Sequence, residues 1–197
     1  MRNSLLVALI FVLLILLFGW IFTSYNNLVR LDENVGAKWS QVLNQYKRRY
    51  DLIPNLVATV QGYADHEQET LTEIANLRSQ AGKTMLSPDL TTNPQAMKAF
   101  QESQTALSSA LSRLMVIVER YPDLKANESF MSLQAQLEGT ENRITVARKE
   151  YIEAVKQFNI RVRTIPTAWI ASWMGMERKQ TFDIPESEQQ APHVEFK

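Results

Sequence analysis

Leu5–Phe22 reads LLVALIFVLLILLFGWIF, and this stretch decides how the rest of the chain is organised. Its 18 residues carry no charge, and no charged residue occurs between Arg2 and Arg30. At a rise of about 1.5 Å per residue, roughly 20 apolar residues cross a hydrocarbon core of about 30 Å. We therefore predict that a helix over residues 5–24 crosses a membrane once.

A cleaved signal peptide is the competing interpretation of this stretch. Such a peptide has an apolar region of about 7–15 residues that ends in small residues at the cleavage site. Here Gly19–Ser24 reads GWIFTS, with bulky groups where small ones are required. An uncleaved anchor also places Trp20 and Tyr25 where interfacial aromatic residues gather. A wholly buried core helix is a further alternative, and the uniform hydrophobicity of all faces argues against it.

The composition limits the classes of function. The 197 residues include 21 basic and 21 acidic side chains and no cysteine. This balance of charge provides no basic field to collect nucleic acid. The lack of cysteine excludes disulfides and thiolate metal sites. Leu, Ala, Gln, Glu, Arg and Lys dominate the chain, which favours helices.

The first helix of the water-exposed part is expected to continue directly from the anchor. From Tyr25 to Tyr46, apolar residues recur at spacings of three and four. Pro54 interrupts this pattern, because proline lacks an amide hydrogen and clashes with the preceding helical turn. Asp51 is a candidate N-cap, so we predict a tight reversal at residues 49–51 and a new helix to about Ala81. One helix kinked at Pro54 is the alternative.

Two more helices are expected further along the chain. Residues 81–93 are predicted to form a loop, after which Asn93 and Pro94 start a helix as N-cap and first residue. A last long helix is expected from about Asn127 to Ile165. The predicted fold is therefore all-α, with an N-terminal transmembrane helix followed by an antiparallel four-helix bundle of long helices. The alternative has three long helices, the first kinked at Pro54. The predicted parts are a membrane anchor (1–24), a helical bundle (25–176) and a polar C-terminal tail (177–197).

A short apolar segment precedes the tail. Thr167–Met176 reads TAWIASWMGM, which is uncharged and too short to span a bilayer. Trp169 and Trp173 are four residues apart, so they share one helical face. Two interpretations stay open: the tryptophans lie in the membrane interface, or they cap the core of the bundle.

His66 and Glu67 form the stretch with the strongest likeness to a catalytic motif. A zinc-protease helix needs His-Glu-x-x-His, so that both imidazoles face one ion. Here Thr70 stands in the place of the second histidine. A metal site at His66 requires carboxylates from another helix, such as Glu141 or Glu150. We therefore predict no metal and no cofactor, and instead a polar helix face or a hydrogen-bonded histidine.

Other polar residues are predicted to serve the structure. Arg48 and Arg49 end one predicted helix and Asp51 starts the next, so their charges match the two helix dipoles. Binding of an anionic partner is the alternative. Asn55 and Asn159 are predicted to be buried and to fix the helix register, with partner recognition as the alternative. The sequence contains no nucleophile–base pairing and no Gly-rich phosphate loop, so we predict that the protein is not an enzyme.

The chain resembles the LemA family in two blocks. The first covers residues 25–71, with the paired Arg48-Arg49 and the run DLIPNLV at 51–57. The second covers residues 150–182, where Tyr151, Asn159 and Phe182 fall in the family's pattern. The resemblance implies a helical bundle behind an N-terminal anchor and no established enzymatic activity.

The resemblance also bears on location. Some similar proteins carry a lipoprotein cysteine just before the Tyr-Asn pair, and lipoprotein domains lie outside the cytoplasm. Here Phe22–Ser24 occupies that place, so a peptide anchor replaces a lipid anchor. The likeness implies a single-pass protein of the bacterial cell (inner) membrane, with the C-terminal domain on the periplasmic or extracytoplasmic side.

These features together predict a membrane-anchored, non-catalytic helical scaffold or adaptor. Its expected partners are the lipid bilayer, through residues 5–24, and other proteins or further copies of itself. No nucleic acid and no small-molecule substrate are expected. Two alternatives remain: a metal-dependent enzyme that uses His66 and nearby carboxylates, and a membrane-surface sensor that uses Trp169 and Trp173.

Overall fold

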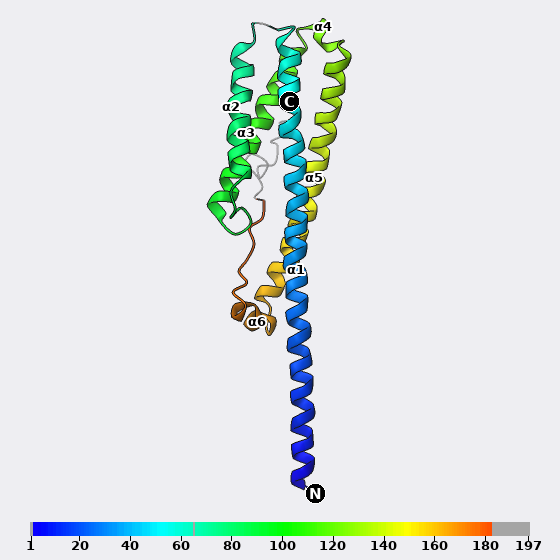
Figure 1. Ribbon diagram of the computed structural model, residues 1–197, viewed down its shortest axis with the longest axis vertical. Helices are drawn as coiled ribbons and strands as arrows, with labels where there is room; N and C mark the ends of the chain where they lie inside the picture. Colours follow the sequence, from blue (N-terminus) through cyan, green and yellow to red (C-terminus); the bar gives the residue numbers. More distant parts are fainter. Residues whose placement is uncertain (1, 65, 183–197) are drawn as a thin grey trace, which may run out of the picture.

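The computed structural model describes residues 2–64 and 66–182, and this part of the chain is helical, with no strand. The helices are joined by short loops, and long helices succeed one another in alternating directions (Figure 1). In chain order they are α1 (Arg2–Gln61), α2 (Gln68–Met85), α3 (Pro94–Val118), α4 (Pro122–Lys125), α5 (Glu128–Arg163) and α6 (Thr167–Trp173).

Helix α1 joins the predicted anchor to the bundle without interruption. Its 60 residues correspond to a rod of about 90 Å at about 1.5 Å per residue. It is the one helix in the described ranges that is long and apolar enough to cross a membrane. The large apolar side chains of residues 6–22 are exposed along it. Such a surface is unfavourable in water and favourable in lipid, as the sequence predicts for an anchor.

The predicted reversal at residues 49–51 is wrong, because α1 continues past Pro54 to Gln61. The chain instead reverses between Gly62 and Glu67. Helix α2 accordingly starts 17 residues later than Asp51 and ends at Met85 rather than Ala81. Asp51 is no N-cap but an exposed residue within α1, 3.5 Å from the ammonium group of Lys47.

A side chain from α2 explains how α1 tolerates Pro54. In an α-helix the amide of residue 54 would donate to the carbonyl oxygen of Tyr50, and proline has no such hydrogen. The Nε of Arg78 donates to this oxygen instead, at 2.9 Å. The same guanidinium lies 3.6 Å from the centre of the Tyr50 ring. A Cβ at Gly82 would come within 2.8 Å of that ring, so glycine permits the close approach of α2 to α1.

The helices pack as two antiparallel pairs. Helix α5 runs beside α1 over much of its length, and α2 packs on α3 (Figure 1). The predicted starts of two helices are confirmed, since Asn93 caps α3 through Gln95 N and Ala96 N, and Asn127 caps α5 through Phe130 N. Two apolar clusters fill the bundle. One surrounds Ile53, Leu107 and Leu137 at the end far from the anchor, and the other surrounds Val42, Phe100 and Phe158 nearer to it.

Residues 177–182, which we call the strap, fasten the chain after α6 back onto the bundle. Backbone N and O of Lys179 bond to the Asn159 side chain, each at 2.9 Å. The Tyr151 hydroxyl donates to the carbonyl of Gln180 at 2.7 Å. Phe182 is buried. The start of the predicted loose tail is thus packed, and the remainder, 183–197, lies outside the described residues.

The compensation at Pro54 predicts a measurable coupling. We expect Arg78→Met to cost about 1–3 kcal/mol of unfolding free energy, because it leaves the Tyr50 carbonyl without its donor. Pro54→Ala restores a helical amide, so the cost of Arg78→Met should fall by about 1 kcal/mol in that background. Denaturant unfolding of the four full-length proteins in detergent, followed by circular dichroism, measures this cycle.

Arg113→Met provides the matched control for this cycle. Arg113 on α3 forms an exposed ion pair with Glu73, so its loss should change stability by at most about 1 kcal/mol. That small change should be the same with proline or alanine at position 54. An equal cost of Arg78→Met in both backgrounds would contradict the role given to the Tyr50 carbonyl.

Candidate functional site

A polar layer divides the two apolar clusters of the bundle. Each of three helices places a polar residue in the core where the two clusters meet. On each helix the neighbouring core residue on one side belongs to one cluster, and the neighbouring core residue on the other side belongs to the other cluster. The layer consists of the buried Arg49 on α1, Gln104 on α3 and Thr140 on α5, and at its edge Ser108 and the half-exposed Glu141 bond to Arg49. A polar layer of this kind is suited to fix helix register, because any slip would leave buried polar groups without partners.

Arg49 is the centre of the polar layer and only 1% exposed. Its Nη1 donates to Ser108 Oγ at 2.6 Å and to Glu141 Oε1 at 2.7 Å. Its Nη2 donates to the side-chain oxygen and the backbone carbonyl of Gln104. One guanidinium therefore links α1, α3 and α5. A buried cation is stable only when it is paired and hydrogen-bonded. Glu141 and these oxygens provide partners for both Nη atoms of Arg49, whereas its buried Nε has no hydrogen-bond partner among the described residues.

A hollow of about 230 Å³ lies beside this layer, bordered by Tyr46, Arg148 and Phe182 among others. The Arg148 guanidinium lies 4.5 Å from the centre of the Phe182 ring. Burial raises the pKa of the Tyr46 hydroxyl above its ordinary value of 10.0, against the opposite effect of the Arg148 and Arg49 charges. Ser108 and Glu141 also border the hollow, and both accept hydrogen bonds from Arg49.

A second site lies where the anchor leaves the bundle. We call it the α1–α6 groove. It has a volume of about 560 Å³ and its lining is apolar or aromatic throughout. Trp169 and Trp173 are 70% and 84% exposed, so their side chains do not cap the core, and that alternative is wrong. Thr167 and Ala171 occupy the buried face of α6 instead. The lining residues are Leu17, Trp20, Ile21, Tyr25, Pro166, Trp169, Ile170 and Trp173.

The predicted roles of Arg48, Arg49 and Asp51 at a helix boundary are wrong. All three lie inside α1, with Arg49 12 residues before its last residue, so no helix dipole ends there. Arg48 and Asp51 are exposed, whereas Arg49 is buried. Asn55 is also exposed rather than buried, and its carbonyl accepts from the Thr59 hydroxyl at 2.8 Å.

Asn159 is partly buried but does not fix the register of neighbouring helices. Its side-chain amide pairs with the backbone of Lys179 and thereby holds the strap. Glu141 and Arg148 belong to a charged stretch of α5, a pattern typical of solvated surface. In the structure Glu141 completes the polar layer and Arg148 covers Phe182. The sequence does indicate one member of the layer, because Gln104 is the lone polar residue in the apolar repeat of α3.

The structure does not assemble the metal site considered for His66. This residue is exposed in the loop between α1 and α2, and not on a helix face. Glu67 accepts from the Tyr121 hydroxyl and pairs with Arg120, both at 3.2 Å. Glu141 is engaged by Arg49 and Glu150 by Lys38. Within residues 2–64 and 66–182, no three His, Cys, Asp or Glu side chains converge as metal ligands.

Comparisons with known proteins give a consistent result. A sequence profile described as the LemA family matches residues 38–196. The chain is 27% identical to magnetosome protein MamQ 2 of Paramagnetospirillum magneticum and 26% identical to MamQ of Magnetospirillum gryphiswaldense. Each of these similarities covers 80% of this chain but 64% of the relative, which is less than two thirds of its length. Protein LemA of Metamycoplasma hominis is 24% identical, over 91% of this chain and 78% of that protein.

The polar layer predicts different effects for two similar glutamates. Glu141 and Glu150 have side chains that are 45% and 44% exposed, but their partners differ, since the Arg49 side chain is 2% exposed and that of Lys38 is 30%. We expect Glu141→Gln to cost about 2–4 kcal/mol, because it leaves a buried cation without its counter-charge. Glu150→Gln should cost about 1 kcal/mol or less.

Denaturant unfolding of both full-length variants in detergent measures the difference. Addition of Arg49→Met to Glu141→Gln should recover part of the lost stability, since the uncompensated charge is then removed. Equal costs for the two glutamate variants would refute the assignment of Glu141 as the counter-charge of the layer.

Two buried tyrosines predict a loss of stability at alkaline pH. Burial raises the pKa of Tyr151, whose hydroxyl holds the strap, and also the pKa of Tyr46. Because the folded-state pKa exceeds the unfolded value of 10.0, this stability is complete below pH 10.0 and is lost as the pH rises through the folded-state pKa. Melting temperatures measured against pH should fall as the pH rises above 10.0, and they should fall less steeply in Tyr151→Phe than in wild type. An unchanged slope in this variant would contradict the prediction.

Proposed function

Because the chain belongs to the LemA family, we propose that it is a membrane-anchored, non-catalytic helical scaffold that holds protein partners or further copies of itself at a membrane. The protein is membrane-associated, and its domain is helical. The relatives named magnetosome protein MamQ carry the name of a structure and not of a reaction. That naming is consistent with an assembly role for this chain.

The continuity of α1 is the observation that carries the proposal. The same helix enters the lipid and reaches the far end of the bundle, with no linker between the two parts. Helix α5 packs along it, and Arg78 stabilises its backbone at the single proline. A flexible tether would let a domain explore all orientations. This construction instead holds the sides of the bundle at set heights above the membrane, which suits a scaffold.

The sides of the bundle offer contact surfaces for such partners. Val116 on α3 and Val146 on α5 are exposed apolar residues within the water-exposed part. A shallow hollow between α1 and α5 is lined by Gln41, Gln45 and Val146 among others. A non-obligate interface is about as apolar as the rest of the protein surface, so such a side can bind a partner without a large apolar patch.

Two finer points belong to the same proposal. We propose that α1, α2, α3 and α5 form an antiparallel four-helix bundle, which the two apolar clusters and the polar layer support. We also propose that the bundle lies on the periplasmic or extracytoplasmic side of a bacterial inner membrane. The support is the likeness to lipoprotein relatives at Phe22–Ser24.

A membrane-surface sensor is the second candidate function, favoured by the exposure of Trp169 and Trp173.

Site-specific crosslinking tests the scaffold. A photoreactive amino acid at position 116 or 146 should give discrete adducts of higher mass in intact cells, identified by mass spectrometry as another membrane protein or a second copy. The same residue at Ser129, an exposed polar position on α5 outside the hollow, is the matched control and should give weaker adducts. Absence of adducts at both apolar positions, with a monomer on native gels of the solubilised membrane, would exclude the proposed role.

A further inference from the structure

The α1–α6 groove lies at the depth of a membrane surface. One wall consists of Leu17, Trp20, Ile21 and Tyr25, all on α1. Counted from Leu5, about 20 helical residues reach the end of a hydrocarbon core of about 30 Å, which is near this wall. The wall is thus continuous with the surface of α1 that faces lipid. Because α6 packs against α1, the other wall is held at the same level.

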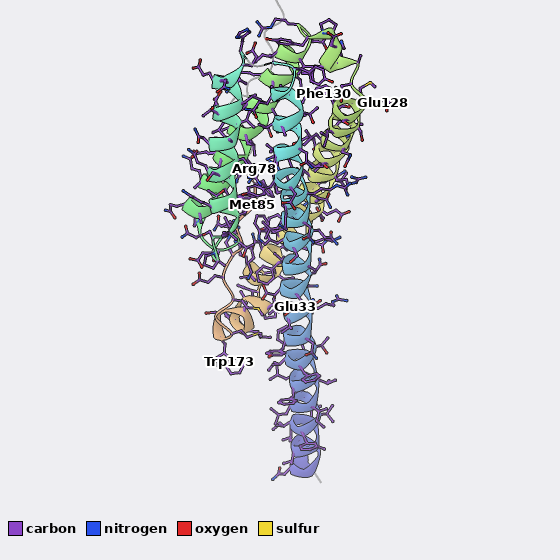
Figure 2. The ribbon with its side chains drawn as sticks, turned by 45° about the horizontal axis from the view of Figure 1, so that its top comes forward. Glu33, Arg78, Met85, Glu128, Phe130 and Trp173 are labelled. Carbon is purple, nitrogen blue, oxygen red and sulfur yellow. The ribbon has the colours of Figure 1, made fainter. Side chains whose placement is uncertain are left out.

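The two faces of α6 are chemically distinct. Thr167 and Ala171 point into the bundle, and the Thr167 hydroxyl donates to the carbonyls of Arg161 and Thr164. Trp169 and Trp173 project outward on the opposite side. Figure 2 shows Trp173 at the end of the bundle from which the anchor emerges. The orientation of α6 is therefore set by the bundle, and its aromatic face is turned outward without a covering element among the described residues.

The surroundings of the groove match a lipid interface better than water. Residues 164–176 carry no charge, and Ile165 adds a further exposed apolar side chain. Arg161 and Arg163 stand in the last turn of α5, directly before this segment, and Glu177 and Arg178 follow it. All four are exposed, so three cations stand against one carboxylate. Tryptophan favours the boundary between acyl chains and headgroups, and flanking arginines attract anionic headgroups.

We propose that the α1–α6 groove is a lipid-binding site that receives acyl chains from the leaflet nearest the bundle, with Trp169 and Trp173 in the interfacial region. Helix α6 then acts as a second membrane contact beside α1. A single transmembrane helix is free to tilt and to rotate about its axis within limits set by its flanks. Two contacts fixed to one rigid bundle restrict both motions. The inference rests on membrane insertion of α1 but not on the scaffold's choice of partner.

Spin labels on single cysteines test this proposal, and the chain itself contains no cysteine. The full-length protein is reconstituted in vesicles of phosphatidylethanolamine and phosphatidylglycerol. A nitroxide at Ser172→Cys reports on α6, one at Phe18→Cys on the anchor, and one at Ser112→Cys on the water-exposed face of α3. Collision with oxygen, which concentrates in lipid, is compared with collision with a water-soluble nickel complex.

We expect the oxygen-to-nickel accessibility ratio at position 172 to lie close to that at position 18 and severalfold above that at position 112. In the Ser172→Cys background, Trp169→Ser with Trp173→Ser should shift the ratio toward the value at position 112. Leu86→Ser is the matched control, because Leu86 is as exposed as Trp173, at 84%, but lies outside the groove. It should leave the ratio unchanged.

Two outcomes overturn the proposal. A ratio at position 172 equal to that at position 112 means that α6 stays in water. Low accessibility to both probes means that protein, such as a helix of a second copy, fills the groove. A water-like ratio at position 18 would instead overturn the insertion of α1, and the crosslinking at positions 116 and 146 reports separately on the scaffold. Equal melting temperatures of the tryptophan variants and wild type establish that the fold is retained.

Discussion

The continuity of α1 depends on the hydrogen bond that the carbonyl oxygen of Tyr50 accepts from Arg78. Pro54 withholds the helical donor that this oxygen needs, and a partly buried carbonyl without a donor costs free energy. Arg78 supplies the donor from α2. The contact has two consequences, since it preserves one straight path from the anchor to the far end of the bundle and it fixes α2 against α1. Gly82 belongs to the same arrangement, because only a residue without a side chain leaves room for the Tyr50 ring.

The polar layer around Arg49 applies a second constraint at nearly the same height. Apolar clusters alone tolerate sliding of one helix past another, because one aliphatic contact replaces another at little cost. A guanidinium bonded to α3 and to α5 at once has one low-energy register. The layer therefore specifies how the helices align along their axes, while the apolar clusters on either side bury most of the apolar surface. Its chemistry is that of a structural ion pair between helices.

Local signals in the sequence predict much of this architecture. Asn93 is the N-cap that the sequence predicts, the last long helix starts near Asn127 as expected, and the apolar anchor is evident from composition alone. Pro54 misleads, because its cost is offset by Arg78, 28 residues from Tyr50 in sequence, and no local pattern contains that information. The burial of Arg49 follows from the unbroken helix and was missed for the same reason. The tryptophan pair in α6 could be recognised as one face, but its pairing with Trp20 and Ile21 across the groove is tertiary.

The strap imposes an order on the assembly of this fold. Phe182 packs among Trp39, Phe100 and Tyr151, with ring centres 6.0, 6.5 and 5.7 Å away. These rings come from α1, α3 and α5, and more than a hundred residues separate the first from the last. A chain emerging from the ribosome therefore exposes its apolar N-terminal segment long before this aromatic core is complete. Until Phe182 arrives, that core has an open aromatic side, so the domain completes its folding only after the anchor has been synthesised.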